Sequence, residues 1–277
     1  MWKKKKTGSM ICPACGKLIS ADAPSCVYCG RKNTGIWSAI SISERMLGPY
    51  FRFNEIVTII CIVLYILSLA LDPAEIATRV GLFSVLAPSV VAVAKLGAAG
   101  QWAIANGRVW TYITAIYLHG NLLHIFFNLW WIRQIAPVVK ELYGTSRLIS
   151  IFTISGAIGF VLSSRFTILT IGASGAIFGL LAALIYYGKS RGGTFGTNIY
   201  LQVGKWAIIL FVFGFIMPRV DNWAHAGGFL GGLVSAMILG YNEKIPEKSS
   251  HRILAIIFIG VTIIAFLLTF LTIGQVK

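Results

Sequence analysis

Charged side chains are scarce in this chain, and acidic ones most of all. Of its 277 residues 12% are charged, nine are Asp or Glu, and five are Cys. So little charge excludes a soluble enzyme and a disordered chain, and so few cysteines exclude a disulfide-rich secreted domain. Apolar residues make up 57% of the chain, and the mean hydropathy is +0.79. The composition therefore predicts a membrane protein.

Apolar stretches long enough to cross a bilayer recur seven times. A spanning helix needs about 20 mostly apolar residues, and such stretches lie at 53–71, 118–135, 148–164, 172–188, 200–217, 222–241 and 253–273. Residues 72–109 are broken by Pro73, Pro88 and Lys95, yet they are too apolar for an ordinary loop. We expect short amphipathic helices at the membrane interface there. The predicted fold class is an all-α polytopic membrane protein.

The positions of the basic residues predict the orientation. Lys and Arg near the ends of spans are retained in the cytoplasm, and a cytoplasmic N-terminus puts eighteen of the 24 inside. No cleavable signal peptide is expected, because cysteines rather than an apolar run follow the Lys-rich start. We therefore expect a multi-pass cell-membrane protein with an extracytoplasmic C-terminus. Although the net charge is +15, basic residues placed between spans argue against a nucleic-acid partner and for the lipid bilayer.

Four cysteines form two C-x-x-C pairs near the N-terminus: Cys12, Cys15, Cys26 and Cys29. Two such pairs, each followed by Gly, can complete a tetrahedral shell of four thiolates around Zn²⁺. We expect a cytosolic zinc-ribbon module at residues 1–35, folded by the metal, and a linker at 36–52. The alternatives are reduced cysteines in a flexible tail and a redox-active pair.

A four-cysteine site has no open position for a substrate, so this zinc is expected to be structural. No cofactor is expected to take part in catalysis. The module could recruit a cytosolic partner, sense zinc or brace the first span, and the residues do not rank these roles.

Few reactive side chains lie within the apolar stretches, where polar groups mark function. His124 and Asn128 are four residues apart, so a helix places both on one face. Ser174 and His225 each stand near the start of a later span. Taken singly, each could be a packing or bridging residue. Together they suggest a serine hydrolase, because a serine nucleophile needs a base and its oxyanion intermediate needs hydrogen-bond donors.

Small residues surround the serine and follow the histidine. The pairs with G-x-x-x-G spacing are Gly175 with Gly179 and Gly228 with Gly232, and Gly172 precedes the serine by two residues. Such spacing is typical of faces on which two helices approach closely in lipid. These five glycines are therefore predicted to serve structural close packing around the site.

Three motifs, in this order, resemble those of rhomboid intramembrane serine proteases: H-x-x-x-N at 124–128, G-x-S-G at 172–175 and A-H-x-x-G-x-x-x-G at 224–232. The resemblance covers residues 53–277, which would form a six-helix core plus one C-terminal transmembrane helix. It implies that Ser174 is the nucleophile and His225 the base of a dyad. It further implies that His124, Asn128 and the Ser174 backbone N–H line the oxyanion hole.

The resemblance also implies that residues 72–109 form a first loop embedded in the membrane. The substrates would be membrane proteins with a single transmembrane helix, cut where that helix is destabilised. A catalytically silent relative that binds client helices is the alternative. A transporter would need charges at mid-membrane and internal repeats, and the sequence has neither.

The chain departs from the family pattern at two places. Trp110-Thr111 stands where the family often has Trp-Arg, so the first loop could be anchored differently. Phe178 replaces a common Tyr and is expected to stack beneath His225. Asp221, four residues before His225, could complete a triad or cap the helix, and the cap is the simpler interpretation.

Overall fold

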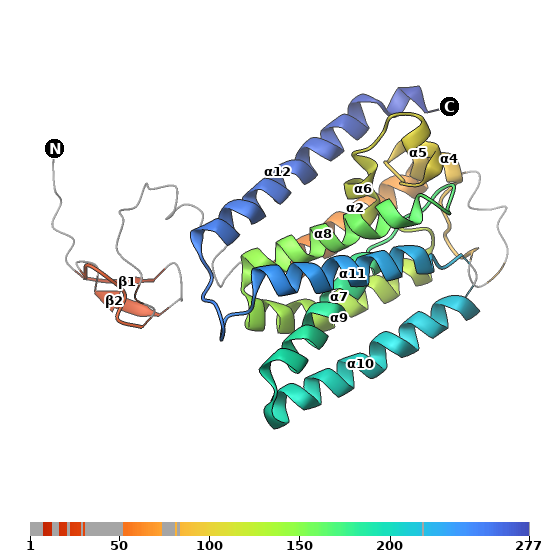
Figure 1. Ribbon diagram of the computed structural model, residues 1–277. Helices are drawn as coiled ribbons and strands as arrows, with labels where there is room; N and C mark the ends of the chain where they lie inside the picture. The colour runs from red at the N-terminus through yellow and green to blue at the C-terminus, as the bar shows by residue number, and fades with distance from the viewer. Residues whose placement is uncertain are drawn as a thin grey trace, which may run out of the picture.

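The computed structural model describes residues 8–12, 17–20, 23–28, 30, 52–73, 81, 84–217 and 219–276. Near the N-terminus, strands β1 (Ser9–Ile11) and β2 (Leu18–Ser20) pair antiparallel in a two-stranded sheet. The backbone N–H of Cys12 donates to the carbonyl of Lys17 at 2.8 Å and extends this pairing. The elements that follow in the described chain are helices joined by loops (Figure 1).

Every apolar stretch predicted from the sequence lies on a long helix (Figure 1). The seven helices are α2 (Phe53–Ala70), α7 (Leu122–Tyr143), α8 (Thr145–Ser163), α9 (Ser174–Arg191), α10 (Gly193–Ile216), α11 (Asn222–Leu239) and α12 (Ser249–Leu271). The predicted 118–135 span starts later, at Leu122, because the side chain of Asn121 accepts the backbone N–H of His124 at 2.7 Å and caps α7.

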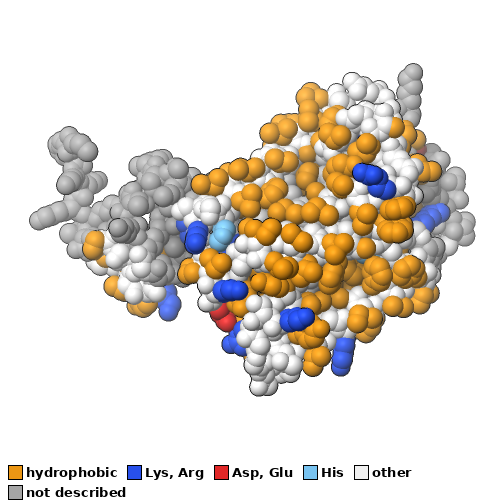
Figure 2. Space-filling model, in the orientation of Figure 1, with side chains coloured by type: hydrophobic (Ala, Val, Ile, Leu, Met, Phe, Trp, Pro, Cys, Tyr) orange, Lys and Arg blue, Asp and Glu red, His pale blue; other side chains and the backbone are white. Residues whose placement is uncertain are grey.

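Five of the described helices are long and apolar enough to cross a membrane: α2, α7, α8, α10 and α12. Helices α9 and α11 do not meet this criterion, because α9 ends in Lys189, Ser190 and Arg191 and α11 contains four glycines besides Asn222 and His225. Hydrophobic side chains are spread across the face seen in Figure 2, with Lys and Arg at scattered places between them. The chain is thus an all-α, multi-pass membrane protein, and its seven spans stay a prediction.

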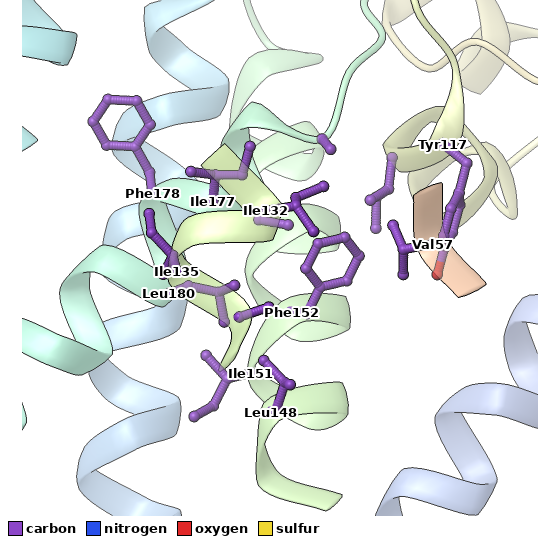
Figure 3. Close-up of a cluster of buried hydrophobic side chains, with 14 of the residues drawn as sticks. Val57, Tyr117, Ile132, Ile135, Leu148, Ile151, Phe152, Ile177, Phe178 and Leu180 are labelled. Carbon is purple, nitrogen blue, oxygen red and sulfur yellow. The ribbon is translucent and has the colours of Figure 1, made fainter. Parts of the chain in front are cut away.

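Helix α8 lies at the centre of the packing, and most of its residues are buried. Its Phe152 is fully buried and is surrounded by apolar side chains from α7, α9 and the 3-10 helix η2 (Ala115–Tyr117), as Figure 3 shows. Helix α10 contrasts with it, because only Gly196, Ala207 and Gly214 are buried along its length. It lies at the edge of the bundle in Figure 1.

Short helices lie between α2 and α7, two of them within residues 72–109, where the sequence predicts short helices; their position at the membrane interface stays a prediction. They are α4 (Val90–Lys95), α5 (Gln101–Ala105) and α6 (Thr111–Thr114). The C-terminal helix α12 is tied to this segment, because the Trp110 indole N–H donates to the Thr269 hydroxyl at 3.0 Å. A last 3-10 helix, η3 (Ile273–Gln275), follows α12.

Candidate active site

Ser174 and His225 lie in hydrogen-bond contact inside the bundle. The Ser174 Oγ and the His225 Nε2 are 2.9 Å apart, within the range in which a base can take the proton of a hydroxyl. Ser174 is the first residue of α9, and His225 lies in the first turn of α11. Two residues 51 positions apart in the chain thus form the pair that nucleophilic catalysis requires.

Helices α9 and α11 approach at the level of their backbones. A Cβ added at Gly228 would lie 2.1 Å from the carbonyl oxygen of Gly175, and one at Gly232 would lie 2.3 Å from the Cα of Gly179. No side chain fits at either position while the helices stay where they are. Because Ser174 and His225 lie at the same end of these two helices, the close approach brings them into contact.

The segment before Ser174 is held by backbone hydrogen bonds to Ala99, which lies between α4 and α5, and to Ala115 of η2. Ala99 and Thr170 form an antiparallel bridge, and the N–H of Gly172 donates to the carbonyl of Ala115 at 2.9 Å. Gly172 has a φ of +127°, a conformation that favours glycine. The short segment into α9 is therefore fixed at both of these points.

His124 lies directly beside this segment. A Cβ added at Gly172 would lie 2.6 Å from the His124 Nε2. The other ring nitrogen, Nδ1, accepts the backbone N–H of Gly120 at 3.3 Å. A neutral imidazole that accepts at Nδ1 carries its hydrogen on Nε2, so His124 presents a donor toward the segment that leads to Ser174.

Asn128 is buried one turn further along α7. Its Nδ2 donates to the His124 carbonyl at 2.9 Å, which uses one of the two N–H groups of the amide. The structure therefore places His124 and Asn128 together on one face of α7, as their spacing predicts.

Asp221 caps α11. Its Oδ1 accepts the backbone N–H of Ala224 at 3.0 Å. Its Oδ2 accepts the hydroxyl of Thr170 at 2.6 Å and that of Ser163. Both carboxylate oxygens of Asp221 therefore accept hydrogen bonds from groups other than His225. Asp221 acts as the cap of α11 and not as the third member of a triad. The carboxylate also fastens α8 and the segment before α9 to the start of α11.

The group that contacts the second nitrogen of His225 is Asn222, which the sequence analysis missed. The Asn222 Oδ1 lies 3.1 Å from the His225 Nδ1. The spacing of three residues, which puts both side chains on one helical face, is the signal that could have found it.

Phe178 stacks on the imidazole as expected. The ring centroids of Phe178 and His225 are 4.4 Å apart, and the ring planes are inclined by 22°. His225 is 6% exposed. The imidazole is therefore fixed by a ring contact as well as by hydrogen bonds.

Two of the four predicted zinc ligands lie among the described residues. Cys12 and Cys26 are buried, whereas Cys15 and Cys29 fall outside the described residues. Within the part of the chain that the structure describes, no three His, Cys, Asp or Glu side chains cluster as metal ligands would.

The sequence of this chain is similar to those of known proteins over the helices that carry the candidate site. Residues 106–242, which include all of α7 to α11, match the Rhomboid domain family. The chain is 37% identical over 149 residues to Rhomboid protease GluP of Bacillus subtilis (strain 168), which covers 52% of this chain and 29% of that one. It is 30% identical over 220 residues to RHOMBOID-like protein 5 of Arabidopsis thaliana, covering 69% and 68% of the two chains.

A third relative is Rhomboid-like protease 3 of Toxoplasma gondii, 28% identical over 197 residues, covering 69% of this chain and 70% of that one. The chain thus spans about two thirds of the plant and Toxoplasma relatives but under a third of GluP.

Proposed function

This chain belongs to the rhomboid family, and from that premise we propose that it is an intramembrane serine endopeptidase working through a Ser174–His225 dyad. The observation that carries the proposal is the 2.9 Å contact between the Ser174 Oγ and the His225 Nε2. A hydroxyl is a weak nucleophile unless an adjacent base removes its proton. A serine that served only packing would have no need of an imidazole at this position.

In the proposed reaction, the Ser174 Oγ attacks the scissile carbonyl carbon while the His225 Nε2 takes the hydroxyl proton. The imidazolium then gives that proton to the leaving amine, and the acyl-enzyme remains. Water attacks the ester with His225 again as the base, which releases the acid product and restores Ser174.

Donors for the oxyanion are proposed to come from two helices. Helix α9 begins at Ser174, so the first backbone N–H groups of that helix, including that of Ser174, have no acceptor within the helix. The Nε2–H of His124 faces the same segment. Asn128 has a second amide N–H besides the one it donates to the His124 carbonyl. Such fixed donors stabilise the charge that develops on the carbonyl oxygen.

The substrates are proposed to be membrane proteins with a single transmembrane helix that is destabilised near the cut. In a stable helix each carbonyl accepts a backbone hydrogen bond, so the scissile carbonyl is hindered from reaching Ser174. With the N-terminus in the cytoplasm, the charge distribution puts Ser174 and His225 toward the outer face of the membrane. Cleavage would then take place within or just below that face.

The N-terminal module is proposed to hold a structural Zn²⁺ through Cys12, Cys15, Cys26 and Cys29. The described residues fit this, because Cys12 and Cys26 are buried while the apolar side chain of Val27 is 81% exposed. The two buried thiols are placed as zinc ligands would be in a module too small for a sizeable hydrophobic core. Zinc would replace that core by joining the two cysteine pairs.

Cleavage of a fluorogenic single-span substrate in liposomes tests the protease. We expect Ser174→Ala and His225→Ala to be folded but silent, while Ser150→Ala, a buried serine of α8 bonded to the carbonyl of Ser146, cleaves like the wild type. Labelling of Ser174 by a fluorophosphonate should follow the same order. Cleavage by Ser174→Ala at the wild-type rate would refute the dyad. A wild type that neither cleaves nor is labelled would instead support a silent protein that binds client helices.

Zinc content of the purified full chain tests the module. We expect about one Zn²⁺ per chain, and its loss in the Cys12→Ser/Cys15→Ser double variant. Cys61→Ser removes a cysteine buried in α2 and should leave the zinc content unchanged. Equal zinc in the double variant and the wild type would refute the assignment.

A further inference from the structure

The imidazole of His225 has three neighbours that fix its orientation. Ser174 lies at the Nε2 and Asn222 at the Nδ1, while Phe178 stacks on the ring face. Asp221, the nearest carboxylate in the sequence, is occupied as the cap of α11. The polar partner of the Nδ1 is thus an uncharged amide.

The identity of that partner determines which nitrogen can act as the base. A neutral imidazole carries one hydrogen, and the nitrogen without it is the acceptor. The Oδ1 of Asn222 can only accept, so at 3.1 Å it favours the hydrogen on the Nδ1. The lone pair then lies on the Nε2, toward the Ser174 hydroxyl. With the opposite tautomer, His225 would present an N–H to the serine and could not take its proton.

Asn222 in turn lies against α10. A Cβ added at Gly214 would lie 2.2 Å from the Asn222 Oδ1, so Gly214 leaves the space that this oxygen occupies. Phe211, one turn earlier on α10, contacts Phe178 with ring centroids 6.2 Å apart. Helix α10 therefore contacts both the amide and the ring that position the imidazole of His225.

We propose that Asn222 is a positioning residue for the catalytic base His225. Because Gly214 packs against Asn222, the ability of His225 to take the serine proton then depends on the position of α10. This inference rests on the proposed dyad. It assigns Asn222 the part that a carboxylate plays in a triad, which is to hold the base in the reactive tautomer without touching the substrate.

The first test compares substitutions of Asn222 in the full chain, with the rate of fluorophosphonate labelling of Ser174 as the readout. Asn222→Leu removes the acceptor at similar size, and we expect labelling to slow about 100-fold, the usual contribution of a positioned base. Asn222→Asp keeps an oxygen that can accept from the Nδ1 of His225, so its labelling rate should be within about threefold of the wild-type rate. A role in packing alone predicts the reverse, because Leu fills the space and Asp adds a buried charge.

The second test acts from α10. We expect Gly214→Ala to displace the Asn222 side chain and slow labelling about tenfold or more, in the range known for small misplacements of catalytic groups. Gly204→Ala is the matched control, because a Cβ at Gly204 on the same helix meets nothing within 4 Å. In the Asn222→Leu background, Gly214→Ala should slow labelling little further, since the hydrogen bond to His225 that it disturbs is already gone.

Cleavage of the single-span substrate by the same variants should show a lower kcat at a similar KM, because Asn222 does not touch the substrate. Wild-type labelling by Asn222→Leu, or equal rates for Gly214→Ala and Gly204→Ala, would overturn the inference. Ser174→Ala and His225→Ala belong in the same panel. If they still cleave, the proposed dyad has failed; if they are silent while Asn222→Leu is fully active, only the role of Asn222 has failed.

Discussion

The contact between α9 and α11 allows a quantitative prediction for Gly228→Ala. The added Cβ would lie 2.1 Å from the Gly175 carbonyl oxygen, and backbone atoms on both sides leave no flexible group to give way. Two helices overpacked in this way must separate by roughly 1 Å, at a cost of about 1–3 kcal/mol in stability. Since Ser174 and His225 lie on these two helices, the 2.9 Å hydrogen bond lengthens by a similar amount.

A displacement of about 1 Å in a catalytic pair costs on the order of 100-fold in rate. We therefore expect Gly228→Ala to lower both the thermal midpoint in detergent and the rate at which a fluorophosphonate labels Ser174. Gly231→Ala on the same helix is the control, because the atoms nearest its Cβ would belong to the Ile158 side chain, at 3.0 Å or more, and not to backbone. If Gly228→Ala were labelled as fast as Gly231→Ala, the close backbone contact would not be what brings Ser174 to His225.

Two further substitutions test single contacts. Asp221→Asn should leave the labelling rate of Ser174 within about threefold of the wild type, whereas loss of a triad member would slow labelling by several orders of magnitude. It should also lower the midpoint of thermal unfolding, because an amide accepts hydrogen bonds from fewer hydroxyls than a carboxylate does. A roughly 1000-fold slower labelling rate would mean that Asp221 belongs to a triad after all. Thr269→Val leaves the Trp110 indole N–H without its acceptor and should cost about 1 kcal/mol, measured as the midpoint of thermal unfolding. Thr272→Val removes a hydroxyl bonded only within its own helix, and a drop as large as that for Thr269→Val would mean that the link to Trp110 contributes nothing.

The positions of the helices could be predicted because lipid imposes a simple rule on sequence. A segment that crosses a bilayer must be apolar over about 20 residues, and every stretch selected by that rule lies on a long helix. The helix ends were less predictable, since they depend on single hydrogen bonds. The Asn121 side chain, for example, starts α7 four residues after the predicted 118.

Buried hydrogen bonds between distant segments could not be read from local patterns. Arg147 counted in the sequence only as a basic residue near a span end, yet its side chain is fully buried. Its guanidinium donates to the carbonyls of Gly240 and Ile245 and to the Asn242 side chain. These acceptors lie more than 90 residues further along the chain. No periodicity in the sequence reports such a pairing.

The candidate site shows why apolarity alone is a poor guide to the helices that carry it. Helices α9 and α11 are the two long helices that fall short of the criterion for crossing a membrane. Glycines such as Gly175 and Gly228, which add little apolarity, are the residues that let their backbones touch. His225 is 6% exposed, so this polar side chain is shielded from hydrocarbon although other residues of α11 are exposed. The weak hydropathy of α11 therefore follows from the glycines, Asn222 and His225 that build the site, whereas that of α9 follows mainly from Lys189 and Arg191 at the end opposite Ser174.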